Sequence, residues 1–183
     1  FPKKSLFFLF SILFPVLLVS QTIDTIVVTA TRSSIPLNQV SAPITVIDRE
    51  QIDLSLAKDL SQILRFEAGL EIGRNGGPGQ ATSIFMRGTE SNHTLVLIDG
   101  VRINPGTIGG AALQNISPEI IERIEIVKGA RSSLYGTDAI GGVINVITKK
   151  VNSNSINTSV GYGSFNNRTA LMDLGYANQS SEI

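Results

Sequence analysis

Few side chains in this 183-residue sequence have the types and spacing that enzymatic chemistry requires. The single histidine, His93, lies in the polar stretch ESNHT, and Asp99 follows it, but the G-x-S-x-G sequence of a serine nucleophile is absent. We therefore interpret His93 as a solvated loop residue rather than a member of a Ser-His-Asp triad. The sequence contains no cysteine, which excludes thiol catalysis, disulfide bonds and thiolate metal sites.

The acidic side chains and the glycine-rich stretches indicate no other catalytic or cofactor site. Four carboxylates near apolar segments lack both the paired spacing of acid–base catalysis and the pattern of a calcium loop: Glu67, Glu71, Asp99 and Asp138. Neither GxxxxGK[ST] nor GxGxxG after a strand occurs, so no phosphate-binding loop is predicted. We expect a protein that is not an enzyme.

The elements that would position any site follow an α+β pattern. Apolar runs and alternation predict six strands, at residues 44–47, 70–72, 83–88, 94–100 and in the ERIEIVKG and VINVITKK segments, the fourth closing on an Asp-Gly turn. Apolar residues at helical spacing predict a helix over residues 55–66, with Ser55 as its N-cap. Ser117, Pro118 and Glu119 have the order typical of another helix start.

The first twenty residues and the overall charge restrict the cellular location. Lys3 and Lys4 precede an apolar stretch over residues 5–19, which is typical of a secretory signal peptide, and we expect cleavage after Ser20. An anchored N-terminal helix is the alternative interpretation. The 15 basic and 15 acidic residues balance, which argues against nucleic-acid binding. Outside the leader there is no 20-residue apolar stretch, so we expect either a soluble protein or a membrane β-barrel.

The C-terminal residues change to a period of two. In SINTSVGY and TALMDLGYA, apolar residues alternate with small or polar ones, and SFNN lies between the two runs. Ile156, Val160 and Tyr162 share one face of the first run, while Met172 and Leu174 share one face of the second. This pattern predicts a hairpin of the kind found in outer-membrane β-barrels. An amphipathic hairpin on a soluble sheet remains an alternative.

A short β-prone run, DTIVVTATR, follows the leader and has no evident partner strand. The polar, proline-containing sequence SSIPLNQV comes next and is typical of a mobile linker. An extended segment on such a tether is suited to adding a strand to a partner's sheet. The alternative is an edge strand of the chain's own domain.

Several of these segments resemble, in the same order, the plug domain of TonB-dependent outer-membrane receptors. The resemblance rests on the run SIFMRGTESNHTLVLIDGVRIN and on ISPEIIERIEIVKGARSSLYGTDAIGGVINVITKK, and it covers about residues 24–150. It implies an α+β fold, with a mixed sheet of about four strands and short helices, followed by the first hairpin of a truncated transmembrane β-barrel. The expected divisions are a signal peptide (1–20), a TonB box and linker (21–40), the plug (41–150) and two barrel strands (151–183).

The resemblance also implies two sets of binding residues. It identifies a TonB box, the segment that pairs with the periplasmic domain of the energising protein TonB. The residues of this box are Asp24, Thr25, Ile26, Val27, Val28, Thr29 and Ala30. It places ligand contacts in two glycine-rich loops whose backbone can approach a bulky ligand, at Gly76, Gly77, Gly79, Gln80, Ala81, Thr82, Ser83, Asn104, Gly106, Ile108 and Gly109. Plain surface turns are the alternative interpretation of both loops.

Taken together, these patterns predict a receptor of the Gram-negative outer membrane that imports a nutrient. Within the family, NGGPGQATSIFMRGT and HTLVLIDGVRIN are most similar to cobalamin transporters, so cobalamin is the expected ligand, with an iron–siderophore or haem receptor as the alternative. A soluble periplasmic binding module is a more distant alternative, against which the hairpin argues. The expected partners are TonB, the nutrient and outer-membrane lipid. We expect no cofactor in this segment, and any calcium would bind to barrel loops beyond it. Since a 22-stranded barrel needs far more residues than follow Lys150, we expect a fragment.

Overall fold

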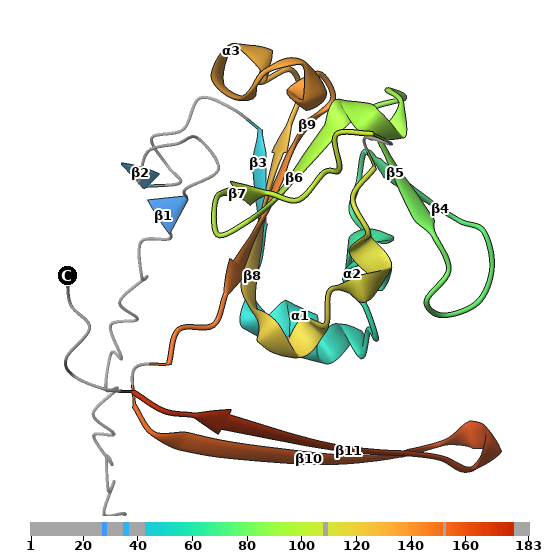
Figure 1. Cartoon of the computed structure of the whole chain (residues 1–183), viewed down its shortest axis with the longest axis vertical. Helices are drawn as coiled ribbons and strands as arrows, with labels where there is room; N and C mark the ends of the chain where they lie inside the picture. Colours follow the sequence, from blue (N-terminus) through green and yellow to red (C-terminus); the bar gives the residue numbers. More distant parts are fainter. Residues whose placement is uncertain (1–26, 29–34, 37–42, 108–109, 152, 178–183) are drawn as a thin grey trace, which may run out of the picture.

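The computed structural model describes residues 27–28, 35–36, 43–107, 110–151 and 153–177 (Figure 1). Its centre is a five-stranded mixed sheet in the order β3-β8-β9-β6-β7. The strands are β3 (Ile44–Ile47), β8 (Ile121–Lys128), β9 (Gly142–Thr148), β6 (Thr94–Ile98) and β7 (Val101–Arg102). β6 and β9 run parallel, and the other neighbours are antiparallel. The predicted mixed sheet is confirmed, with β7 as a two-residue addition at its edge.

The predicted Asp-Gly turn after β6 is also confirmed. Asp99 and Gly100 both have positive φ, at 49° and 81°, which is the backbone that a tight hairpin turn requires. The Asp99 carboxylate accepts hydrogen bonds from Thr148 at its backbone nitrogen (2.9 Å) and at its hydroxyl (2.6 Å). The turn is therefore tied to the end of β9.

The helix predicted over residues 55–66 is wrong in its bounds, because one helix ends at Ser55 and another begins only at Leu60. α1 (Arg49–Ser55) was missed, and it ends where Leu56 adopts a left-handed backbone at φ 51°. α2 (Leu60–Leu64) starts after Asp59, whose side chain accepts a hydrogen bond from the Gln62 backbone nitrogen. Ser55 is thus the last residue of α1 and not an N-cap.

The other helices are single turns. The helix start predicted at Ser117 is confirmed only as the 3₁₀ turn η4 (Pro118–Ile120), after which the chain enters β8 directly. The remaining short helices described are η2 (Ser91–His93), η3 (Leu113–Asn115), α3 (Ser132–Tyr135), η5 (Thr137–Ala139) and η6 (Ser164–Asn166). Among the residues that the structure describes, no helix is long and apolar enough to cross a membrane.

The core lies on both faces of the sheet. On one face, α1, α2 and the hairpin of β4 (Leu70–Arg74) and β5 (Thr82–Met86) enclose the main cluster, which includes Ile52, Leu64, Met86, Ile124 and Ile144. On the other face, α3 and η5 cover one end of the sheet, where Tyr135 and Ala139 pack against a smaller cluster (Figure 1). The first predicted ligand loop therefore leaves a hairpin that packs on the main cluster.

The predicted C-terminal hairpin is confirmed as β10 (Ser155–Gly163) and β11 (Asn167–Gly175), which form a sheet of their own. The register places Ile156 opposite Leu174 and Val160 opposite Ala170, so the apolar residues of both strands share one face. A further short pair joins β1 (Val27–Val28) to β2 (Ile35–Pro36) in antiparallel register.

Candidate functional site

The first predicted ligand loop connects β4 to β5 and is closed at its base by backbone hydrogen bonds. The Asn75 nitrogen donates to the Ala81 carbonyl oxygen (3.1 Å), and within the tip the Gln80 nitrogen donates to the Gly77 carbonyl oxygen (3.2 Å). The tip residues are exposed: Gly76, Gly77, Gly79, Gln80 and Ala81. Thr82 and Ser83 belong to β5, and Thr82 is buried. The loop thus presents main-chain groups and one long polar side chain to its surroundings.

The second predicted loop begins at a buried anchor. The Asn104 side-chain oxygen accepts a hydrogen bond from the Val96 nitrogen (2.7 Å), and its amide nitrogen donates to the Thr94 carbonyl oxygen (3.0 Å). Asn104 therefore binds the edge of β6 as a strand would, and sequence reasoning did not foresee this role. Gly106 is exposed, while Ile108 and Gly109 lie outside the described residues.

Both loops are anchored close to the start of α2. Arg74, the last residue of β4, donates through Nη2 to Asp59 Oδ2 (2.7 Å) and to Ser61 Oγ (2.5 Å), and Ser61 Oγ donates to Asp59 Oδ1 (2.5 Å). Thr82 donates to Gln114 Oε1 (2.8 Å), just beyond the second loop. We call Asp59, Ser61 and Arg74 the α2 junction.

The electrostatics of the α2 junction favour an ionised carboxylate. Burial raises the pKa of Asp59, but the hydrogen bonds from Ser61, Arg74 and the Gln62 backbone outweigh this effect and lower the pKa below its usual value. The sequence contained a signal for this junction, because Asp59 and Gln62 have the D-x-x-Q spacing of a helix cap. The prediction of a helix from Ser55 concealed it.

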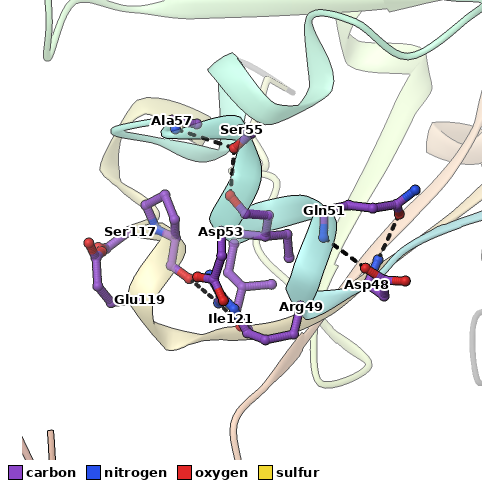
Figure 2. A network of polar contacts seen from close by, with 11 residues as sticks. Asp48, Arg49, Gln51, Asp53, Ser55, Ala57, Ser117, Glu119 and Ile121 are labelled. Atoms are coloured by element: carbon purple, nitrogen blue, oxygen red, sulfur yellow. Dashed lines mark hydrogen bonds and ion pairs between the residues drawn. The ribbon is translucent and has the colours of Figure 1, made fainter.

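A second polar network joins α1 to the start of β8 (Figure 2). From the first turn of α1, Arg49 Nη1 donates to the Pro118 carbonyl oxygen (2.7 Å) and to the Ile121 carbonyl oxygen, while Nη2 pairs with Asp53 (2.5 Å). Asp48 and Gln51 form a reciprocal capping box at the start of the helix. This network fixes the corner of the domain that faces the C-terminal hairpin.

A cavity of about 940 Å³ separates that corner from the hairpin. Its lining includes Arg49, Asp53 and Lys149 on one side and Ser159, Thr169 and Asp173 on the other. The hairpin therefore turns mostly small and polar side chains toward the domain, together with Tyr162, Phe165 and Leu171. Ile156, Val160, Met172 and Leu174, on the opposite face, are exposed and do not line the cavity. None of the predicted ligand-contacting residues that the structure describes lines it either.

The residues considered for catalysis are not brought together. His93 precedes β6 and Asp99 follows it, so the length of a five-residue strand separates them. In the described part of the chain, His, Asp and Glu side chains form no group of three that would hold a metal ion. Of the predicted TonB box, the structure describes only Val27 and Val28, which form β1, and the other five residues lie outside the described ranges.

A comparison with protein families accounts for the arrangement of sheet, loops and short helices. A family model described as the TonB-dependent Receptor Plug Domain matches residues 36–143, more than half of the chain. The chain belongs to this plug-domain family. The expected fold class is thereby confirmed, as a plug domain followed by a strand hairpin.

Solved receptor structures contain the same plug fold. P. aeruginosa FpvA, solved with heterologous pyoverdines bound, is 25% identical with a TM-score of 0.66, over 80% of this chain and 19% of FpvA. The siderophore receptor PiuA from Acinetobacter baumannii is 27% identical with a TM-score of 0.63, over 76% of this chain and 19% of PiuA. The ferric yersiniabactin uptake receptor FyuA from Yersinia pestis is 21% identical with a TM-score of 0.61, over 76% of this chain and 22% of FyuA. At this identity the likeness supports the fold alone. The chain spans about a fifth of the length of these receptors.

Proposed function

We propose that this chain is the N-terminal part of a TonB-dependent outer-membrane receptor that imports a scarce nutrient. The observation that carries the proposal is the plug-domain match, which extends over both predicted ligand loops and the sheet between them. The plug would close the lumen of the barrel and carry a ligand site on its outer side. In this proposal the segments are leader (1–20), TonB box and linker (21–40), plug (41–150) and first barrel strands (151–183).

An iron–siderophore complex is the proposed ligand. The receptors compared above include a siderophore receptor and one solved with pyoverdines, at 25–27% identity. Cobalamin, which the loop sequences favoured, has no support among these receptors. Ligand contacts are proposed at the exposed tip of the 75–81 loop and at the described part of the second loop, Gly106 included.

The hairpin supports the proposed place in the membrane. Its polar residues line the cavity beside the plug, whereas Ile156, Val160, Met172 and Leu174 do not line it and are exposed, Val160 at 89% and Leu174 at 66%. A barrel strand in an outer membrane has the same division between a polar lumen and apolar lipid. We propose that outer-membrane lipid covers this apolar face.

Coupling to TonB is proposed for residues 24–30. The extended backbone at Val27 and Val28, which pairs with β2, supports a segment suited to strand addition. In such pairing the main-chain groups supply most of the affinity, so a proline at Val28 would remove one donor and uncouple transport from ligand binding.

A spin-label experiment tests the box and the ligand together. These 183 residues contain no cysteine, so in a receptor whose other cysteines have been replaced Val27→Cys gives a single labelling site, and Ser133→Cys on the exposed surface of α3 serves as the control. We expect ferric enterobactin or ferric pyoverdine to change the mobility of the label at position 27 and leave that at 133 unchanged. A response to cobalamin alone would identify cobalamin, and not a siderophore, as the ligand. A label whose mobility changed with none of the three compounds would contradict the proposed coupling.

A further inference from the structure

The α2 junction places a charged cluster directly beneath an exposed, glycine-rich loop. Arg74 is the last residue of β4, and the loop starts at the next residue. Asp59 and Ser61 are 4% and 1% exposed, and the Arg74 side chain is 17% exposed. The three side chains form a closed set, in which Arg74 donates to both partners and Ser61 also donates to Asp59. A buried carboxylate with these donors is costly to leave unpaired.

The same junction connects the two predicted ligand loops. Asp59 caps α2, and the next residue, Leu60, donates from its nitrogen to the Ile116 carbonyl oxygen (3.0 Å), shortly after the second loop. At the other end of the first loop, Thr82 donates to Gln114. The stems of both loops are therefore bound to one short helix and to the turn beside it.

The tip between these stems has no comparable support. A side chain at Gly77 or Gly79 would meet no other atom within 4 Å, so neither glycine is required by close packing. Glycine loses more conformational freedom on ordering than other residues do, and a flexible loop lowers affinity by that cost. Apart from the hydrogen bond between the Gln80 nitrogen and the Gly77 carbonyl oxygen, the fixed stems are what limits the movement of the tip.

We propose that Arg74 is a positioning residue for ligand capture, which through Asp59 and Ser61 holds the 75–81 loop in its binding orientation and in register with the second loop. Arg74 itself does not contact the ligand. This inference rests on the proposed function, because it assigns the loop to the ligand site. Its physical basis is that a planar guanidinium fixes direction as well as distance.

The test uses the receptor in outer membranes and compares two ion pairs. Arg74→Gln breaks the α2 junction, and Lys128→Gln breaks the matched Lys128–Glu67 pair (2.6 Å; side chains 13% and 18% exposed), which joins β8 to the residues after α2. A spin label at Gln80→Cys reports the mobility of the loop tip, ferric enterobactin affinity reports capture, and the midpoint of urea unfolding reports stability. We expect both substitutions to lower stability, but only Arg74→Gln to mobilise the label and raise Kd roughly tenfold.

Two milder variants keep the test decisive if Arg74→Gln prevents assembly. Arg74→Lys retains the charge but not the planar guanidinium and should restore only part of the affinity, while Ser61→Ala should give an intermediate Kd. Equal effects of Arg74→Gln and Lys128→Gln on Kd and label mobility would overturn the inference. If the unsubstituted receptor bound no ferric siderophore, the ligand assignment would fail, and label mobility alone would then decide whether Arg74 fixes the loop.

Discussion

The plug fold leaves no room for a side chain at Gly142, which lies against the backbone of the neighbouring strand. This glycine has φ +154°, and a Cβ built there would overlap the Val127 carbonyl oxygen and the Met86 sulfur atom. Val127 lies on the neighbouring strand β8, so this atom cannot move without opening the sheet. The glycine in the IGGVIN sequence is therefore required by the close approach of strand and core.

Substitution of this glycine gives a residue-scale prediction. We expect Gly142→Ala to lower the free energy of unfolding by about 1–3 kcal/mol, since it combines overpacking with an unfavourable φ. Gly77→Ala is the control, because a Cβ there meets nothing within 4 Å. Urea denaturation of the two variants measures the difference. Equal unfolding midpoints would show that the sheet accommodates the methyl group.

Among the helices, α1 depends on the Arg49 side chain for its attachment to the sheet, because the helix itself is short. A helix of seven residues is too short to be stable alone. Arg49 connects it to the Pro118 and Ile121 carbonyl oxygens, and Ile52 packs in the main cluster. The docking of α1 therefore combines one apolar contact with a charged donor.

Two substitutions separate the contributions of Arg49. Arg49→Gln removes the charged hydrogen bonds to the two carbonyl groups and should cost about 1.5–3 kcal/mol of stability. Asp53→Asn removes only the ion pair, and since the Asp53 side chain is 68% exposed it should cost less than about 1 kcal/mol. Urea denaturation of both variants, with the exposed Arg65→Gln as reference, checks this order. A larger loss in Asp53→Asn would mean that the ion pair, and not the carbonyl contacts, holds α1.

At the scale of the whole molecule, the hairpin is the part whose stability depends on its surroundings. Its apolar face is exposed in this chain, and its polar face borders the cavity at the α1 corner. A two-stranded hairpin is marginally stable in water without further partners. Lipid on one face and the plug on the other would supply the missing contacts.

Opposite faces of β10 should respond differently to charge. We expect Val160→Arg, on the face proposed to meet lipid, to reduce the amount of receptor assembled in outer membranes, because arginine costs about 2–4 kcal/mol at the bilayer midplane. Ser159→Arg, one residue earlier and on the cavity side, should assemble at nearly the level of the unsubstituted receptor. Quantification of receptor in purified outer membranes tests the pair. The reverse order would place lipid on the polar face.

Local signals in the sequence predict most of the strands, whereas the two-residue strands β2 and β7 were not foreseen. The apolar run before Asp99 and Gly100 predicted β6 and its turn, and the alternation after Ser155 predicted β10, β11 and their shared apolar face. Each signal depends on the period of two and on turn chemistry within a few residues. The plug family could be inferred for the same reason, since its motifs are short and contiguous.

The helix bounds and the contacts beneath the loops depend on tertiary packing. Both helices have D-x-x-Q caps, but the apolar period over residues 55–66 suggested one continuous helix across the left-handed turn at Leu56. The Asp59–Arg74 pair spans 15 residues and the Thr82–Gln114 bond spans 32, and nothing in local sequence states that such residues meet. Contacts of this kind depend on how the sheet packs against α2, and that packing is a property of the whole fold.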